Sequence, residues 1–167
     1  MFQEILHEKL LKASDCSIVS LIIMTTPQMP KEIVIEDLIE QIAAFVKLQL
    51  TETIFPHYDA CYKPVTVVAE KAPPPPSSKR KLNSQFAAVA GGGSAAAAAH
   101  RHKQQMNYFY TRVREMLGLV AELVCQIDLT DTIVITLTSF SVMCFFVENI
   151  NDLQLEAMKI LTNLFSR

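Results

Sequence analysis

The most constraining feature of the sequence is an unbroken series of apolar residues at three- and four-residue spacing in its second half. The series comprises Met106, Phe109, Tyr110, Val113, Met116, Leu117, Val120, Leu123, Val124 and Ile127. This spacing places all of them on one face of an amphipathic helix of about six turns. A stripe of that length needs neighbouring helices to cover it, so an all-α fold is expected.

Two further helices are expected after this one. The later has an apolar stripe formed by Leu153, Ala157, Ile160, Leu161, Leu164 and Phe165. Asn151 is its candidate N-cap, and Gln154 stands three residues on, as in a capping box.

The earlier of the two is less clear, because Ile133 to Leu137 is rich in β-branched residues that favour a strand. The apolar run from Thr132 to Val147 is too long for an ordinary strand and contains no turn residue, which favours a buried helix. Thr130 and Asp131 are candidate caps at its start.

Three helices are expected in the N-terminal part. The first ends near Ala13, and Ser14 and Asp15 restart the pattern before a short buried helix over Ile18 to Met24. The third carries a stripe made by Ile35, Leu38, Ile39, Ile42, Val46 and Leu50. Since proline lacks a backbone donor, Pro56 is expected to end it.

Composition divides the chain into residues 1–62, a low-complexity insertion over residues 63–102, and residues 103–167. The insertion contains a run of four prolines, three consecutive glycines and a run of five alanines, and it cannot bury enough apolar surface to offset its chain entropy, so disorder is expected. Lys63 to Lys103 carries seven basic residues and one acidic residue, so the remaining eight basic and sixteen acidic residues give the helical parts a net charge of −8. Helical parts this acidic are poor candidates for a nucleic-acid surface.

Shifting the sequence by 115 residues places Ile18-Val19 on Ile133-Val134 and Asp37-Leu38 on Asp152-Leu153. The two stretches that this shift aligns are each predicted to form a very apolar helix, a polar break and an amphipathic helix. Repeated helix pairs of about forty residues are typical of HEAT or armadillo α-solenoids, and chance similarity is the alternative.

No arrangement of residues indicates catalysis or a cofactor, because the common nucleophile, phosphate-binding and zinc motifs are absent. His57, Asp59 and Cys61 alternate in a loop, but their spacing does not fit zinc patterns, and packing of Phe55, Tyr58 and Tyr62 against helix ends explains the loop better. His100 and His102 fit a polar lead-in to a helix.

The cysteines do not form a CxxC pair, and Cys125 and Cys144 are expected to act as small buried hydrophobes in a reducing compartment. No segment is long and apolar enough to suggest a membrane span. Lys79, Arg80 and Lys81 form a short basic cluster that an importin or a nucleic acid could bind, which makes it a candidate nuclear-import or regulatory site.

Three stretches resemble the Nipped-B family of cohesin loaders. They are Thr25 to Ile42, Thr53 to Tyr62 and, most specifically, LTDT followed by Phe145 to Arg167 with its FFVEN sequence. The resemblance implies that the chain is a fragment of about six helices from the start of a larger HEAT-repeat body.

The resemblance further implies a non-catalytic scaffold in a nuclear, chromatin-associated protein that loads cohesin for sister chromatid cohesion, loop formation and gene regulation. Cohesin subunits and a Mau2-type partner would be bound by the whole protein, and DNA contact would lie outside this segment. The alternative is a stand-alone helical-repeat adaptor that binds a peptide in a groove between helices.

Overall fold

The computed structural model describes residues 2–28, 30–62 and 94–166, and these form helices and connecting turns without a strand. The helices are α1 (Phe2–Thr25), α2 (Glu36–Gln49), α3 (Phe55–Tyr58), α4 (Ser94–Gln126), α5 (Asp131–Cys144) and α6 (Asn151–Phe165). A 3-10 turn (Lys31–Ile33) precedes α2, and a π-helical turn (Leu50–Ile54) joins α2 to α3. The expected all-α class is confirmed.

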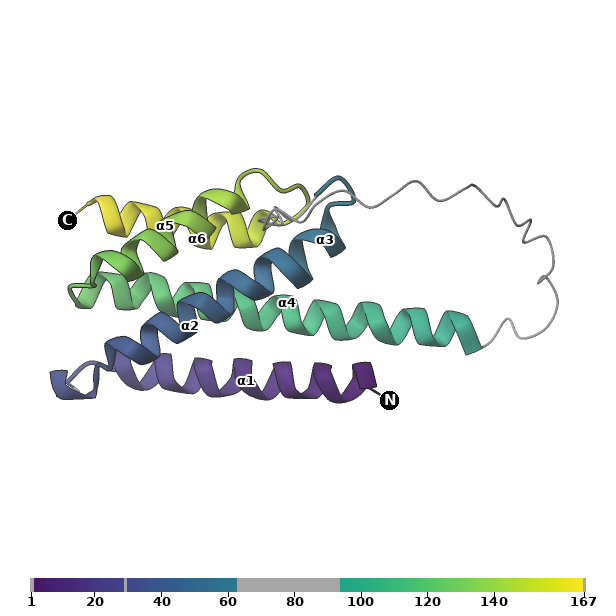
Figure 1. Cartoon of the computed structure of the whole chain (residues 1–167), viewed down its shortest axis with the longest axis horizontal. Coiled ribbons are helices and arrows are strands. Elements are labelled where there is room, and N and C mark those ends of the chain that lie inside the picture. Colours follow the sequence, from purple (N-terminus) through teal and green to yellow (C-terminus); the bar gives the residue numbers. More distant parts are fainter. Residues whose placement is uncertain (1, 29, 63–93, 167) are drawn as a thin grey trace, which may run out of the picture.

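The helices lie in two layers (Figure 1). In one layer α4 packs between α1 and α6, and these three helices run in the same direction. In the other layer α2 packs beside α5, and both run the opposite way across the first layer. The core lies between the layers, where the α4 stripe is buried or half-buried along its whole length, as its spacing predicts.

The expected break near Ala13 is wrong, because α1 is continuous through it. Ser14 is buried, and its hydroxyl donates to the carbonyl oxygen of Leu10 at 2.9 Å. The hydroxyl of Ser17 donates in the same way to the Ala13 carbonyl at 2.8 Å. These serines therefore bond within the helix that contains them, and neither caps a new helix.

Pro56 does not end its helix, contrary to expectation. The backbone widens into the π turn just before it, and Pro56 lies in the first turn of α3. A proline is tolerated in a first turn, where its missing donor matters least and its ring meets fewer preceding carbonyls.

The stretch Ile133 to Leu137 is helical, and both Ile133 and Leu137 are buried in α5. Thr130 occupies the N-cap position, but its side chain makes no capping hydrogen bond. Helix α5 ends at Cys144 and not at Val147.

The capping box expected at Asn151 is wrong. Ile150 is the N-cap of α6, and the amide of Gln154 turns away from the helix start. Its Nε2 donates to the carbonyl oxygens of Val147 at 2.9 Å and Cys144 at 3.2 Å, so it stabilises the turn between α5 and α6.

Helix α4 begins at Ser94 and not at Lys103, so the last residues of the predicted insertion are helical. Residues 63–93, with the candidate site at Lys79, Arg80 and Lys81, lie outside the described residues.

The similarity found on shifting the sequence by 115 residues does not correspond to two copies of one helix pair. It equates α2 with α6, yet α2 lies beside α5 in one layer and α6 lies beside α4 in the other. Helix α5 packs on α6, whereas α1 packs mainly on α4.

In the ranges that the structure covers, no helix is long and apolar enough to cross a membrane.

Candidate functional site

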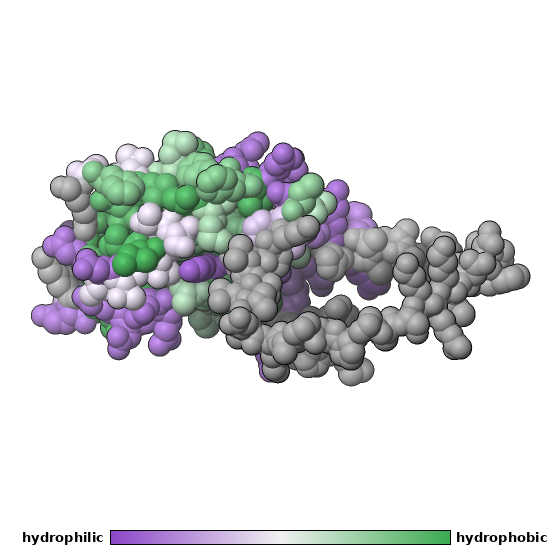
Figure 2. Space-filling view, turned by 45° about the horizontal axis from the view of Figure 1, so that its top comes forward, coloured by the Kyte–Doolittle hydropathy of each residue, from purple (hydrophilic) through white to green (hydrophobic). Residues whose placement is uncertain are grey.

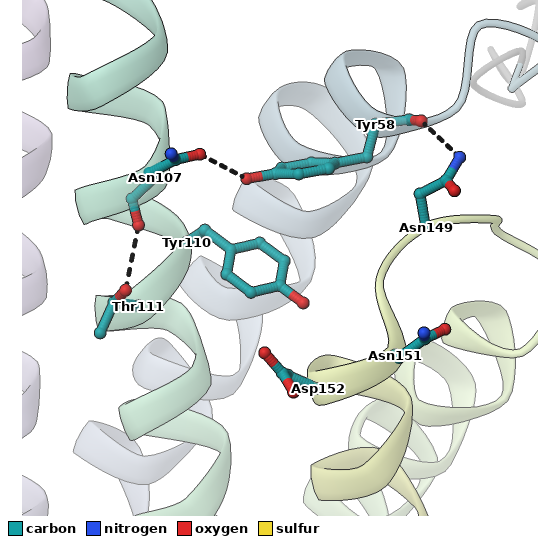
Figure 3. A pocket seen from close by; sticks show the side chains of 7 residues that line it. All are labelled: Tyr58, Asn107, Tyr110, Thr111, Asn149, Asn151 and Asp152. Atoms are coloured by element: carbon teal, nitrogen blue, oxygen red, sulfur yellow. Dashed lines mark hydrogen bonds between the residues drawn. The ribbon is translucent and has the colours of Figure 1, made fainter.

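A polar cavity of about 400 Å³ lies where the end of α3, the middle of α4 and the start of α6 meet (Figure 3). It is lined by Tyr58, Asn107, Tyr110, Thr111, Asn149, Asn151 and Asp152. Its lining consists of hydroxyl groups, side-chain amides and one carboxylate, with two tyrosine rings as the aromatic walls.

The two tyrosine rings contact each other, with their centroids 5.0 Å apart and their planes inclined by 48°. The Tyr58 hydroxyl donates to Asn107 Oδ1 at 3.3 Å, which joins α3 to α4. Burial raises the pKa of Tyr58. Burial also raises the pKa of Tyr110, and the negative charge of Asp152 raises it further, whereas a hydrogen bond from the backbone N–H of Leu153 lowers it. Both phenols therefore stay neutral at physiological pH and can donate hydrogen bonds.

The turn between α5 and α6 forms the opposite wall of the cavity. Asn149 has a φ of 62°, in the left-handed region that asparagine tolerates better than most residues. Its Nδ2 donates to the Tyr58 carbonyl oxygen at 3.4 Å. This bond joins the turn between α5 and α6 to the end of α3.

Asp59 joins the same two segments next to the cavity. Its Oδ1 accepts from the backbone N–H of Cys61 at 2.8 Å, which closes a turn, and its Oδ2 accepts from the N–H of Glu148 at 3.5 Å. The side chains of Tyr58, Asp59 and Asn149 thus come from distant parts of the sequence to one place.

The structure does not bring His57, Asp59 and Cys61 together as a metal site. His57 is exposed, with its ring edge-on to Tyr58 at 5.1 Å, and Asp59 is used in the turn described above. Phe55 is buried and contacts Tyr62 edge-on at 5.2 Å, and Tyr58 contacts Tyr110 of α4. These aromatic residues pack on the core as expected, but Phe55 and Tyr58 do so from the short helix α3 and not from a loop. Within the part of the chain that the structure describes, no three His, Cys, Asp or Glu residues are placed to hold a metal ion.

The remaining candidate residues lie apart from the cavity. His100 is exposed on α4, and His102 lies on the same helix. Cys144 is buried, as expected, and burial raises the pKa of its thiol to about 12. Cys125 is exposed, so its expected burial is wrong, because it lies off the apolar stripe of α4.

Sequence reasoning missed the asparagine side of the cavity. The available signal was the polar stretch Glu148 to Asp152, in which two asparagines and two carboxylates interrupt two apolar helices. Its pairing with Tyr58 could not be read from the sequence, because the residues are about ninety positions apart and meet only through the packing of the two layers.

Apolar side chains are exposed at both edges of the layered structure. At one edge they are Ile135, Val142, Phe145, Phe146, Leu155, Met158 and Phe165, from α5, α6 and the turn between them. Figure 2 shows apolar surface gathered on this side of the molecule. At the other edge α1 exposes Val19, Ile22 and Ile23.

Nipped-B-like proteins match the chain along nearly its whole length. The identity is 34% over 166 residues with the scc-2 protein of Caenorhabditis elegans and 31% over 172 residues with the protein of Mus musculus. The Nipped-B protein of Drosophila melanogaster is 29% identical over 161 residues. The matches cover 96–100% of this chain but only 5–7% of these relatives.

Neither a family model nor a solved structure matches the chain. The resemblance of Phe145 to Arg167 and the two other stretches to the Nipped-B family is confirmed as homology. This chain is therefore homologous to a short segment of the Nipped-B-like proteins.

Proposed function

We propose, from the homology of the whole chain to a segment of Nipped-B-like proteins, that it forms a non-catalytic scaffold segment of a cohesin-loading factor. In this role it would belong to a HEAT-type α-solenoid and help to load cohesin onto chromatin. The observation that carries the proposal is the identity of 34% over 166 residues with the scc-2 protein.

The layered arrangement supports a solenoid segment. In a solenoid, each repeat buries its apolar face only against its neighbours, so an excised segment exposes apolar residues at its two ends. Here α4, flanked on both sides within its layer, exposes mainly polar residues, whereas the free edges of α1 and of α5 with α6 expose large apolar side chains.

Under this proposal the segment acts by contact in the nucleus. Cohesin subunits and a Mau2-type partner would be bound at the level of the whole protein. The excess of acidic residues outside the insertion argues that DNA contact lies elsewhere in that protein.

A segment exchange tests the proposal directly. In the scc-2 protein of Caenorhabditis elegans, the homologous segment is replaced by this chain, and chromatin-bound cohesin is measured in cells that lack the endogenous loader. We expect the chimera to restore cohesin on chromatin, while a deletion of the segment does not.

The matched control exchanges the same segment for that of the Drosophila melanogaster Nipped-B protein, which tests whether the junctions are tolerated. Failure of this chain alongside success of the control would contradict the proposed role.

A further inference from the structure

We propose that the polar cavity between α3, α4 and α6 binds an extended peptide segment through its main chain and one lysine or arginine side chain. This goes beyond the scaffold role proposed above and does not depend on it.

The amides of the lining match a peptide main chain. An asparagine side chain presents one carbonyl acceptor and an NH₂ donor, the same pair of groups that an extended peptide presents at each residue. Asn107 comes from α4, whereas Asn149 and Asn151 come from the opposite wall, so a segment lying in the cavity has amides on both sides (Figure 3).

The lining residues carry one negative charge, which favours a cation over an anion, and Arg114, outside the lining, acts on Tyr110 with the opposite sign. Asp152 is the one ionisable carboxylate among the lining residues, and none of these residues is Lys, Arg or His. Asp152 lies in the first turn of α6, so its charge offsets the partial positive charge of the helix N-terminus that would otherwise favour an anion.

An aromatic wall beside the carboxylate suits a long basic side chain. Tyr110 lies beside Asp152 and directs its hydroxyl towards that residue (Figure 3). The apolar stem of a lysine or arginine can cover such a ring while its charged group reaches the carboxylate.

The size and rigidity of the cavity fit a peptide segment. Its volume of about 400 Å³ holds a few residues and not a folded partner. The hydrogen bonds from Tyr58 to Asn107 and from Asn149 to the Tyr58 carbonyl fix both walls, so binding costs little ordering of the protein.

Titration of the ¹⁵N-labelled chain with two blocked peptides, followed by NMR, tests the proposal. The probes are Ac-Ala-Thr-Ala-Lys-Ala-Thr-Ala-NH₂ and the same peptide with Glu in place of Lys. We expect saturable shifts of the side-chain amide signals of Asn107, Asn149 and Asn151 with the Lys peptide, and at least about fivefold weaker binding of the Glu peptide. Absence of saturable shifts with the Lys peptide would overturn the proposal.

Three variants separate the cavity from general charge attraction. Asp152→Asn should weaken binding of the Lys peptide about fivefold and reduce the preference of the protein for the Lys peptide over the Glu peptide. Asn149→Gly keeps the left-handed backbone but removes the amide, so it should weaken both peptides. Glu122→Gln removes an exposed carboxylate of α4 outside the cavity and should change neither affinity.

An equal loss of affinity for the Lys peptide in Asp152→Asn and Glu122→Gln would show nonspecific attraction to an acidic protein and overturn the proposal. Unchanged binding in Asn149→Gly would overturn the main-chain recognition.

Discussion

Asn163 of α6 donates a hydrogen bond from Nδ2 to the backbone carbonyl oxygen of Ala121 in α4, 2.8 Å away. In the same layer, the Nε2 of Gln126 in α4 donates to the carbonyl oxygen of Thr25 at the end of α1, 3.2 Å away. A carbonyl has two lone pairs, so that of Ala121, inside α4, can accept a side-chain amide in addition to its helical partner. Thr25 is the last residue of α1, where carbonyls lack a helical partner, so the amide of Gln126 satisfies one of them. Because such bonds have fixed partners, they set the position of the three helices relative to one another along their axes. Apolar contacts specify that position less strictly.

Replacement of Asn163 by alanine is expected to lower the free energy of unfolding by about 1 kcal/mol, because the hydrogen bond to α4 is lost. Urea unfolding followed by circular dichroism measures this. The control is Gln41→Ala, which removes an exposed amide from α2 and should change stability by less than about 0.5 kcal/mol. Equal stability of the two variants would show that the Asn163 bond contributes nothing.

Gly118 in the interior of α4 offers a stabilising substitution. A Cβ atom at this position would lie 3.6 Å from Glu156 Oε2, an ordinary contact distance. Gly118→Ala should therefore raise the unfolding free energy by about 0.5–1 kcal/mol, because it reduces the conformational freedom of the unfolded chain.

The larger variant Gly118→Leu probes the same contact, since its side chain would displace the carboxylate of Glu156, both of whose oxygens lie 3.0 Å from Lys159 Nζ. We expect Gly118→Leu to be less stable than the parent chain in the same urea titration. A stable leucine variant would show that α4 and α6 separate more easily than their packing indicates.

The helices themselves were largely predictable, because burial imposes a periodic pattern on each of them. The stripe from Met106 to Ile127 is buried or half-buried as its spacing predicts, and length correctly favoured helix over strand for Ile133 to Leu137. Two of the errors arose where one polar residue had two possible partners. Ser14 bonds to Leu10 within its helix, and Gln154 bonds to Val147 across a turn, and neither choice is visible in the sequence.

The pairing of helices and the cavity could not be predicted, because both depend on contacts between segments distant in the sequence. The sequence similarity between Asp37-Leu38 and Asp152-Leu153 reflects a similar start of two amphipathic helices. The packing places these helices in different layers. The aromatic residues Tyr58 and Tyr110 were each expected to pack, but their meeting beside Asn149 required the three-dimensional arrangement.

The buried thiol of Cys144 makes stability fall at alkaline pH. Its pKa in the folded chain is raised from 9.0 to about 12 by burial, so the folded state keeps the proton while the unfolded state loses it. The stabilisation is present in full below pH 9.0 and is lost progressively as the pH rises towards about 12. The expected slope is on the order of 1 kcal/mol per pH unit in this window.

The variant Cys144→Ala isolates this effect when its unfolding free energy is compared with that of the parent chain across the same pH range. Alanine leaves a small cavity and lowers stability at neutral pH, but the difference between variant and parent should shrink as the pH rises. Tyr58 and Tyr110, whose pKa values are also raised by burial, remain in both chains and cancel in the comparison. A difference independent of pH would contradict the raised pKa.

The exposed apolar residues of α6 are expected to cause self-association of this chain, because large exposed apolar patches favour contact with other surfaces. The double variant Leu155→Lys with Met158→Lys should reduce the sedimenting mass at high protein concentration while changing stability little, since both side chains are exposed. The control Gln41→Lys with Ala44→Lys adds the same charge to the exposed face of α2. An equal reduction in both double variants would assign the effect to net charge and not to the α6 edge.

The basic cluster of Lys79, Arg80 and Lys81 is expected to direct nuclear import, because importins bind short runs of basic side chains. The chain is fused to two fluorescent proteins in tandem to slow passive entry, and the nuclear fraction is measured in living cells. Alanine at all three positions should shift the fusion to the cytoplasm. The control replaces Lys63, Lys71 and Lys103 by alanine, which removes the same charge from the surrounding sequence and should leave the fusion nuclear. If the two triple variants are equally nuclear, import depends on other residues; if both are cytoplasmic, it depends on net charge and not on the cluster.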